Sequence, residues 1–355
     1  MASVSSNDVP HPVAIDEALG ERLQPHEAEL AVKVADLLEG NIHKAYDNKP
    51  GEALRDVHSR ATGVLRAQFK VHEDIPPRFA KGVFVPGKSY EAIVRLSNGS
   101  GDAKKEDERG DSRGCAIKLL NVPGPKLLET DRDATTQDFL MINNPLFFVN
   151  DSKAYLEAMA KNSSDSIIPK LTLPFTLGLK GTLIAAKLGS TKISNPLQVQ
   201  YFSAVPYQLG VGESRLAVKY SLKPVSTAHD AMPSDPEPEF LHKVVEATLA
   251  KKDVEFKFLV QPKVDERQDV EDSMTEWDEK EAPFYEIATL TVPRQDTESE
   301  ELKALVERLS FNPWHSLAEH KPLGSINRTR KIVYERISRV RDQMNHVPRE
   351  EPKVI

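Results

Sequence analysis

Short strand-like runs separated by turn-forming residues limit most what this chain can fold into. The runs are rich in apolar, strand-favouring residues, and glycine, proline, asparagine or aspartate lies between them. They cover residues 63–71, 81–85, 90–96, 115–120, 216–222, 254–261 and 286–292. Short strands that follow one another through such turns are typical of antiparallel sheets and barrels. The sequence therefore predicts an antiparallel β-structure as the centre of the fold.

Helical periodicity flanks these runs on both sides. Apolar residues recur near helical spacing in residues 25–45, and helical patterns also cover 151–162, 238–251 and 328–345, the last stopped by Pro348. The order helix, strands, helices predicts an α+β fold, an antiparallel β-barrel with flanking helices. We predict three segments: a mobile N-terminal tail (1–24), one folded domain (25–347) and a C-terminal tail (348–355).

Composition and charge exclude several classes of protein. Of the 355 residues 39% are hydrophobic and 28% charged, which is typical of a soluble globular protein. The net charge of −7 gives no overall attraction to nucleic acid. Cys115 is the single cysteine, so the chain has no intrachain disulfide. The first residues lack the basic and then apolar pattern of a secretory signal, and we expect a cytoplasmic location.

The most apolar stretch runs from Ile167 to Leu188. Prolines and lysines interrupt it, so we expect no membrane span. A buried helix or a surface flap is the favoured interpretation, and a flap that shelters a channel or a lipid substrate is the alternative.

Common short catalytic motifs are missing from the sequence, which has no P-loop, HExxH, CxxC or nucleophile elbow. Four separated segments combine residue types that carry chemistry instead. They are Arg55 to His58, Arg95 to Ser97, Gln137 to Phe148, and Arg330 to Tyr334 with Arg341 seven residues further on.

In this order and at these intervals the four segments resemble the haem-binding segments of catalases. The resemblance covers roughly residues 50–345, and the run 311–341 is especially similar to the short catalase-related haem peroxidases, sometimes called minicatalases. It implies a catalase-like antiparallel β-barrel with haem b, iron protoporphyrin IX, buried between the barrel and the C-terminal helices.

The resemblance makes Tyr334 the axial ligand of the haem iron, the metal-binding residue of the site. Tyrosine binds ferric iron as the phenolate, although its ordinary pKa is about 10. Arg330 lies four residues earlier, on the same face of a helix, where a guanidinium favours the anion. Arg341 lies seven residues after Tyr334 on that face, and we expect it to pair with a haem propionate.

On the opposite side of the haem the resemblance assigns proton transfer to His58. A neutral imidazole can take a proton from one peroxide oxygen and return it to the other. Ser97 would bond the ring and fix its tautomer, and Asn143 would donate an amide hydrogen to the peroxide. Asn144 is the alternative to Asn143, because the spacing to the following proline differs by one residue from that of classical catalases.

The remaining assignments concern the haem itself. Arg55 and Arg95 match positions that pair with the propionates, since buried carboxylates need fixed cations. Val57 and Tyr155 match positions that pack against the haem face. Cys115 could in principle ligate iron as a thiolate, but we expect a buried structural cysteine.

Together these features predict a haem-dependent peroxidase or catalase. It would react with hydrogen peroxide or an organic hydroperoxide through an oxoferryl intermediate, and then oxidise an organic co-substrate or a second peroxide. One alternative is a fatty-acid hydroperoxide enzyme like coral allene oxide synthase, where a polar residue beside the distal histidine replaces Val57. A haem carrier or sensor is the other. We also expect a homodimer, since the long extensions of classical tetramers are missing.

Overall fold

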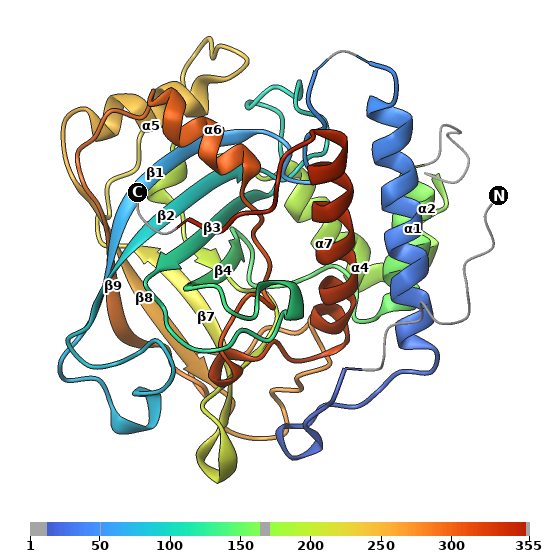
Figure 1. Ribbon diagram of the computed structural model, residues 1–355, viewed down its shortest axis with the longest axis vertical. Helices are drawn as coiled ribbons and strands as arrows, with labels where there is room; N and C mark the ends of the chain where they lie inside the picture. Colours follow the sequence, from blue (N-terminus) through green and yellow to red (C-terminus); the bar gives the residue numbers. More distant parts are fainter. Residues whose placement is uncertain (1–12, 50, 164–170, 353–355) are drawn as a thin grey trace.

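The strands form one antiparallel sheet that closes into a barrel. The computed structural model describes residues 13–49, 51–163 and 171–352. The strands are β1 (Ala61–Val71), β2 (Ser89–Asn98), β3 (Arg113–Leu120), β4 (Thr136–Ile142), β5 (Tyr201–Phe202), β6 (Tyr207–Leu209), β7 (Leu216–Pro224), β8 (Val254–Pro262) and β9 (Tyr285–Val292). Their order is β5-β4-β3-β2-β1-β9-β8-β7-β6, and a β5–β7 pairing joins the two ends. The result is an eight-strand barrel with β6 added beside β7. Figure 1 shows how the sheet curves round on itself.

Aromatic rings fill the inside of the barrel. Phe258 lies 5.0 Å from Phe69, 5.1 Å from Phe139 and 5.7 Å from Phe84, measured between ring centroids. Tyr220 lies 5.3 Å from Phe139. All five side chains are buried. Because successive side chains of a strand point to opposite faces, the alternating pattern places the four rings on strands inside and polar residues such as Lys118 outside, and the turn that holds Phe84 adds the fifth ring.

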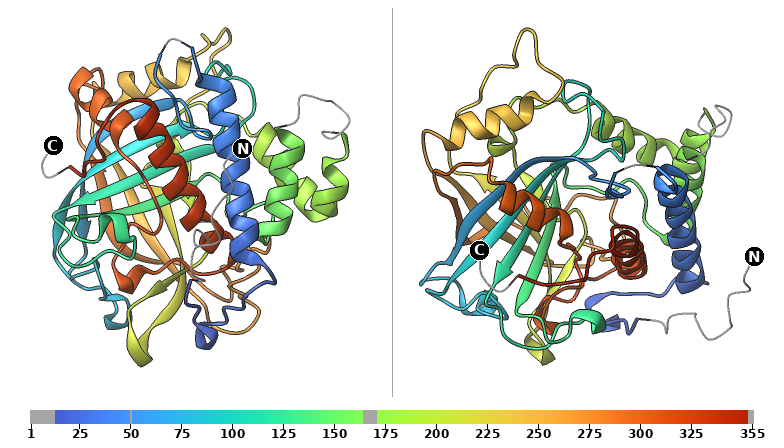
Figure 2. Two further views of the ribbon diagram at one scale, coloured as in Figure 1. Left: turned by 45° about the vertical axis from the view of Figure 1, so that its right-hand side comes forward. Right: turned by 45° about the horizontal axis from the view of Figure 1, so that its top comes forward.

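The helices lie against the outside of the barrel. They are α1 (Glu27–Tyr46), α2 (Ser152–Asn162), α4 (Leu173–Ser190), α5 (Phe240–Leu249), α6 (Glu300–Arg308) and α7 (Ser325–Met344). α7 lies between the barrel and α1 (Figure 2), and it contacts both α1 and α2. Val34 and Leu38 of α1 pack with Val333 of α7. α5 and α6 pack against β1. No helix within the described ranges is long and apolar enough to cross a membrane.

The predicted α+β barrel is confirmed, with differences in its elements, among them the unpredicted β5, β6 and α6. Residues 81–85, predicted as a strand, form a turn: Val83 and Phe84 are buried, but the backbone carbonyl of Val83 accepts a hydrogen bond from Tyr90 Oη at 2.8 Å. Their apolar character reflects burial under the barrel and not strand pairing. β4 was not predicted, and it lies within the segment that the sequence marks for chemistry.

Residues 13–24, predicted as part of a mobile tail, are held to α7. Arg328 is buried and bonds three carboxylates: Glu21 at 2.7 Å, Glu271 at 3.0 Å and Glu27 at 2.9 Å. Glu21 also accepts the backbone N–H of Gly324. Composition could not reveal this network, because its members lie up to about 300 residues apart in sequence. Residues 1–12 and 353–355 of the predicted tails, and 167–170 of the apolar stretch, lie outside the described residues.

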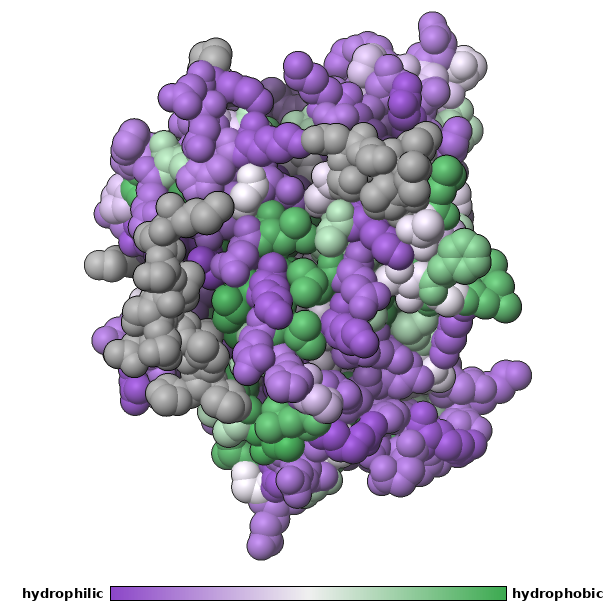
Figure 3. Space-filling model, turned by 90° about the vertical axis from the view of Figure 1, so that its right-hand side faces the viewer, coloured by the Kyte–Doolittle hydropathy of each residue, from purple (hydrophilic) through white to green (hydrophobic). Residues whose placement is uncertain are grey.

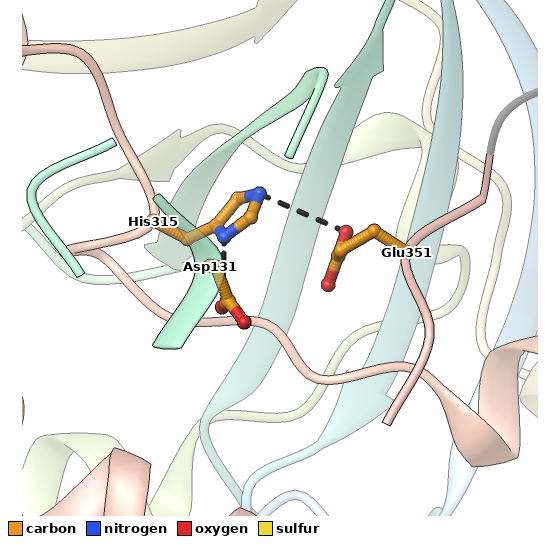
Figure 4. A group of neighbouring side chains, drawn as sticks. All are labelled: Asp131, His315 and Glu351. Atoms are coloured by element: carbon orange, nitrogen blue, oxygen red, sulfur yellow. Dashed lines mark hydrogen bonds and ion pairs between the residues drawn. The ribbon is translucent and has the colours of Figure 1, made fainter. Parts of the chain in front are cut away.

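The other predicted tail, 348–355, is also tied down where the structure describes it. Glu351 pairs with the buried Lys118 of β3 at 2.7 Å, and Arg349 pairs with Asp131 at 2.6 Å. Figure 4 shows His315 between Asp131, 3.0 Å away, and Glu351, 3.7 Å away. Lys118 and Arg349 already neutralise these carboxylates, so we interpret the group as an ion-pair network that fixes the chain end.

The Arg328 network generates a stability prediction. Arg328→Ala leaves three buried carboxylates without their common cation, and we expect it to lower the free energy of unfolding by about 3–5 kcal/mol. The matched control is Arg339→Ala on the same helix, whose exposed ion pair with Glu335 contributes less than about 1 kcal/mol. Urea unfolding measures both. Equal stability of the two variants would contradict the structural role of Arg328.

Candidate active site

A cavity of about 300 Å³ lies between the barrel and α7. This volume is in the usual range for small-molecule and cofactor sites. Nine of the ten predicted site residues line it, and they come from the chain before β1, from β2, α2 and α7. They are Arg55, Val57, His58, Arg95, Ser97, Tyr155, Arg330, Tyr334 and Arg341. The fold thus joins segments that are almost 290 residues apart in sequence.

His58 is held in place through both its ring and its backbone. Its Nδ1 lies 3.0 Å from Ser97 Oγ, and its backbone carbonyl accepts a hydrogen bond from Arg95 at 2.9 Å. Its backbone has a positive φ of 56°, a conformation that costs energy in residues other than glycine. A Cβ at Gly114 would lie 2.6 Å from Nδ1, so only glycine fits against the ring. Sequence reasoning missed Gly114, which lies next to the predicted Cys115.

The electrostatic surroundings keep the His58 imidazole neutral. Burial and then the positive charge of Arg95 lower its pKa to about 4, while the carboxylate of Asp111 acts in the opposite direction. A neutral imidazole can both accept and donate a proton. The ring therefore has the protonation state that acid–base chemistry needs at neutral pH.

The two adjacent asparagines differ in their contacts. Asn143 Oδ1 accepts the backbone N–H of Arg113 at 2.7 Å, which leaves both amide hydrogens of Asn143 for another acceptor. Asn144 is buried and donates to the carbonyl of Leu146 at 2.8 Å, within a turn. Asn143 directly follows Ile142, which lines the cavity, but does not itself line it. The role of Asn143 stays a prediction, and the contacts favour it over Asn144.

On the opposite wall, α7 presents a phenol and a guanidinium together. Arg330 Nη2 lies 3.5 Å from Tyr334 Oη, and the guanidinium carbon lies 5.1 Å from the centre of the Tyr334 ring. Burial acts to lower the pKa of Arg330, but the tyrosine oxygens of Tyr334 and Tyr207 outweigh it and raise that pKa. Asn327 Oδ1 accepts a second hydrogen bond from Arg330 and fixes its direction. The helical spacing of four residues produces this contact as predicted.

Three guanidiniums converge at one end of the cavity with few carboxylates to balance them. Arg55 pairs with Glu307 at 2.8 Å, and Arg95 is 3.8 Å from the same carboxylate. Arg341 is 3.8 Å from Asp342. Arg95 Nε is buried without a hydrogen-bond partner in the described part of the chain. Burial, and then the charge of Arg55, lower the pKa of both Arg95 and Arg341.

Apolar groups form the remaining wall. Phe147 and Phe148 pack against Tyr155, with ring centroids 5.9 Å and 6.1 Å away. Val57 lines the cavity, is 41% exposed and carries no polar group beside His58. Cys115 is buried on β3, where burial raises the pKa of its thiol to about 12. It is therefore a neutral thiol, a state that does not suit a thiolate ligand.

Asp56 is a further cavity residue that sequence reasoning missed. It lies between Arg55 and Val57, and burial raises the pKa of its carboxyl to about 6. The only signal in the sequence is an acidic residue inside a segment already singled out, and nothing there indicates that it is buried.

Taken together the cavity fits a flat apolar cofactor with carboxylates at one edge. The three guanidiniums at one end, with Arg95 Nε unpaired, suit buried anions. The apolar wall suits a hydrophobic ring system, and a phenol beside Arg330 can act as an anionic ligand. Iron protoporphyrin IX combines these properties.

A comparison with protein-family models finds no match. Among proteins of known description, a catalase-related peroxidase from Mycolicibacterium paratuberculosis is 27% identical over 267 residues. The match covers 71% of this chain and 77% of that relative.

Solved structures of catalases have the same fold at low sequence identity. A fungal catalase superposes with a TM-score of 0.68 at 17% identity, covering 97% of this chain and 71% of its own. Catalase A from Saccharomyces cerevisiae gives 0.64 at 17%, covering 87% and 66%, and a bacterial catalase gives 0.66 at 17%, covering 86% and 60%. The chain thus has the catalase fold and is a distant homologue of a catalase-related peroxidase over most of its length.

Proposed function

We propose that the protein is a haem-dependent peroxidase that acts on hydrogen peroxide or an organic hydroperoxide. The observation that carries this proposal is that one cavity has Tyr334 with Arg330 on one wall and His58 with Ser97 on another. An iron ligand and an acid–base residue on opposite sides of a cofactor are what peroxide cleavage needs. The distant homology to a catalase-related peroxidase supports the same activity.

The chain's own residues have distinct tasks in this proposal. Tyr334 would bind the iron as a phenolate that Arg330 stabilises, and Arg55, Arg95 and Arg341 would bind the propionates. Val57 and Tyr155 would pack against the ring system. Bound haem would supply the redox chemistry of iron.

Proton transfer falls to His58. Its neutral ring takes the proton from one oxygen of the peroxide and returns it to the other, which then leaves as water or an alcohol. Ser97 at 3.0 Å holds the ring direction during both steps. The free amide hydrogens of Asn143 are available to orient the peroxide. The electrons that complete the cycle come from an organic co-substrate or a second peroxide.

A fatty-acid hydroperoxide is the second candidate substrate. Leu188, Phe147 and Phe148 give the cavity an apolar wall that suits an acyl chain. Val57 favours peroxide reduction over rearrangement, because it cannot hydrogen-bond His58. Oxygen release from hydrogen peroxide, measured beside the products of a lipid hydroperoxide, separates the two reactions. A haem carrier or sensor, a cytoplasmic location and a homodimer stay predictions.

Replacement of the proposed ligand tests haem binding. We expect the purified protein to show the absorption bands of ferric high-spin haem, and Tyr334→Phe to lose haem or shift these bands, because phenylalanine has no ligand oxygen. The control is Tyr46→Phe on α1, away from the cavity. A wild-type protein without haem, or an unchanged spectrum of Tyr334→Phe, would refute the assignment.

Removal of the proposed acid–base residue tests the chemistry. His58→Ala should lower peroxide-driven oxidation by about 10²–10⁴-fold while haem stays bound, since it removes the proton carrier and no proposed ligand. His242→Ala, an exposed histidine paired with Glu298, serves as the control. Full activity of His58→Ala with haem present would refute the proton-transfer role of His58.

The pH dependence follows from the surroundings of His58. The active form is the neutral imidazole, and its pKa is lowered to about 4, so it stays neutral as pH falls through the ordinary histidine value of about 6.5. We expect turnover to stay nearly constant between about pH 8 and pH 5 and to fall near pH 4. A stopped-flow pH profile measures this. A loss of half the activity near pH 6.5 would mean that the ring is not desolvated.

A further inference from the structure

A row of large apolar side chains lies on the solvent side of α4. Leu171, Phe175, Leu179 and Leu183 are 67%, 87%, 80% and 62% exposed. Leu171 lies just before α4, and the non-helical residue Gly178 (φ 63°, ψ −179°) separates Phe175 from Leu179 and Leu183, which lie one helical turn apart. We call these four side chains the α4 ridge. Figure 3 shows hydrophobic surface protruding at the edge of one face of the molecule, on the side where α4 lies.

The opposite face of α4 is packed against the wall of the candidate active site. Gly181 and Ile184 are buried, and Leu188 lines the cavity. A Cβ at Gly181 would lie 2.8 Å from the carbonyl oxygen of Phe148, another cavity residue, so the helix and the wall are in direct contact. The side chains of the α4 ridge therefore lie on the solvent side of α4, and they have no partner in the described part of the chain.

The charge of this region is opposite to that of the whole chain. Residues 166–212 contain four lysines and no acidic residue, whereas the chain as a whole has a net charge of −7. Lys187 and Lys192 are exposed and form no ion pair among the described residues. Lys180 donates to Thr275 Oγ1 at 2.6 Å. An apolar helix face with lysines and without carboxylates is typical of helices that lie in the surface of a bilayer.

We propose that α4 docks the protein on an anionic lipid surface, with the α4 ridge in the acyl boundary and the lysines at the headgroups. Lys187 and Lys192 complement anionic headgroups, and each lysine near such a surface strengthens binding by about fivefold. A second copy of the chain fits less well, since a stable dimer interface takes about 20–30 residues from each partner and the ridge has four. The proposal does not depend on haem or on peroxide chemistry.

Vesicle flotation of the purified full-length protein tests this docking. Vesicles of phosphatidylcholine with phosphatidylglycerol should carry the protein upward, vesicles of phosphatidylcholine alone should carry much less, and raising sodium chloride from about 0.1 M to about 1 M should weaken binding. Phe175→Ser with Leu179→Ser should lower the bound fraction at least about tenfold, because two apolar side chains no longer enter the lipid.

Matched variants distinguish docking from general effects. Val85→Ser with Val264→Ser removes two exposed apolar side chains elsewhere and should leave flotation unchanged. Lys187→Gln with Lys192→Gln should weaken binding to anionic vesicles, while Lys251→Gln with Lys252→Gln should not. The proposal is overturned if the wild type does not float, if the ridge and control pairs float alike, or if the ridge pair only converts a dimer into a monomer. Circular dichroism verifies that each variant is folded.

Discussion

The rest of the site depends on the concentration of buried positive charge beside α7. Arg55, Arg95 and Arg341 share little more than Glu307 and Asp342 as counterions, and one nitrogen of Arg95 is left without a bond. A folded protein does not retain such a group for stability, because unpaired buried charge is costly. An anion in the cavity would remove this cost, so the charge of these side chains fits a ligand with carboxylates. Because Arg95 is on the barrel and Arg341 is on α7, the barrel and α7 must be held in fixed positions relative to each other.

Two ion-pair networks outside the cavity hold α7 in its position. Arg328, in the first turn of α7, is joined to the N-terminal segment through Glu21 and Glu27, and Glu351 after α7 is joined to Lys118 of the barrel. Both ends of α7 are thus tied to other parts of the chain by buried charges. Tyr334 lies between these two anchors. These anchors help to fix the position of Tyr334 relative to His58, although they contact neither residue.

Local pattern predicted the barrel and most of its helices, and the family resemblance gave nine of the residues that line the cavity. The Arg330–Tyr334 contact follows from helical spacing alone, and the pairing of His58 with Ser97 follows from the family resemblance. Long-range partners could not be predicted in this way. Glu307, Gly114 and the carboxylates around Arg328 meet their partners only through the fold, and neither periodicity nor charge in their own segments indicates it. The N-terminal tail was predicted as mobile for the same reason, since its composition is polar and its partners lie far away in sequence.

The apolar residues of α4 lie on two surfaces, one that faces the interior of the protein and one that faces solvent. A helix that only covered a core would bury its apolar face and expose a polar one. α4 instead buries small or slender residues such as Gly181 and Ile184 and exposes phenylalanine and leucines. Exposed residues of this size cost solubility unless something covers them. Since Leu188 of the same helix lines the cavity, α4 connects the exposed apolar side chains on the outside of the protein with the wall of the proposed peroxide site.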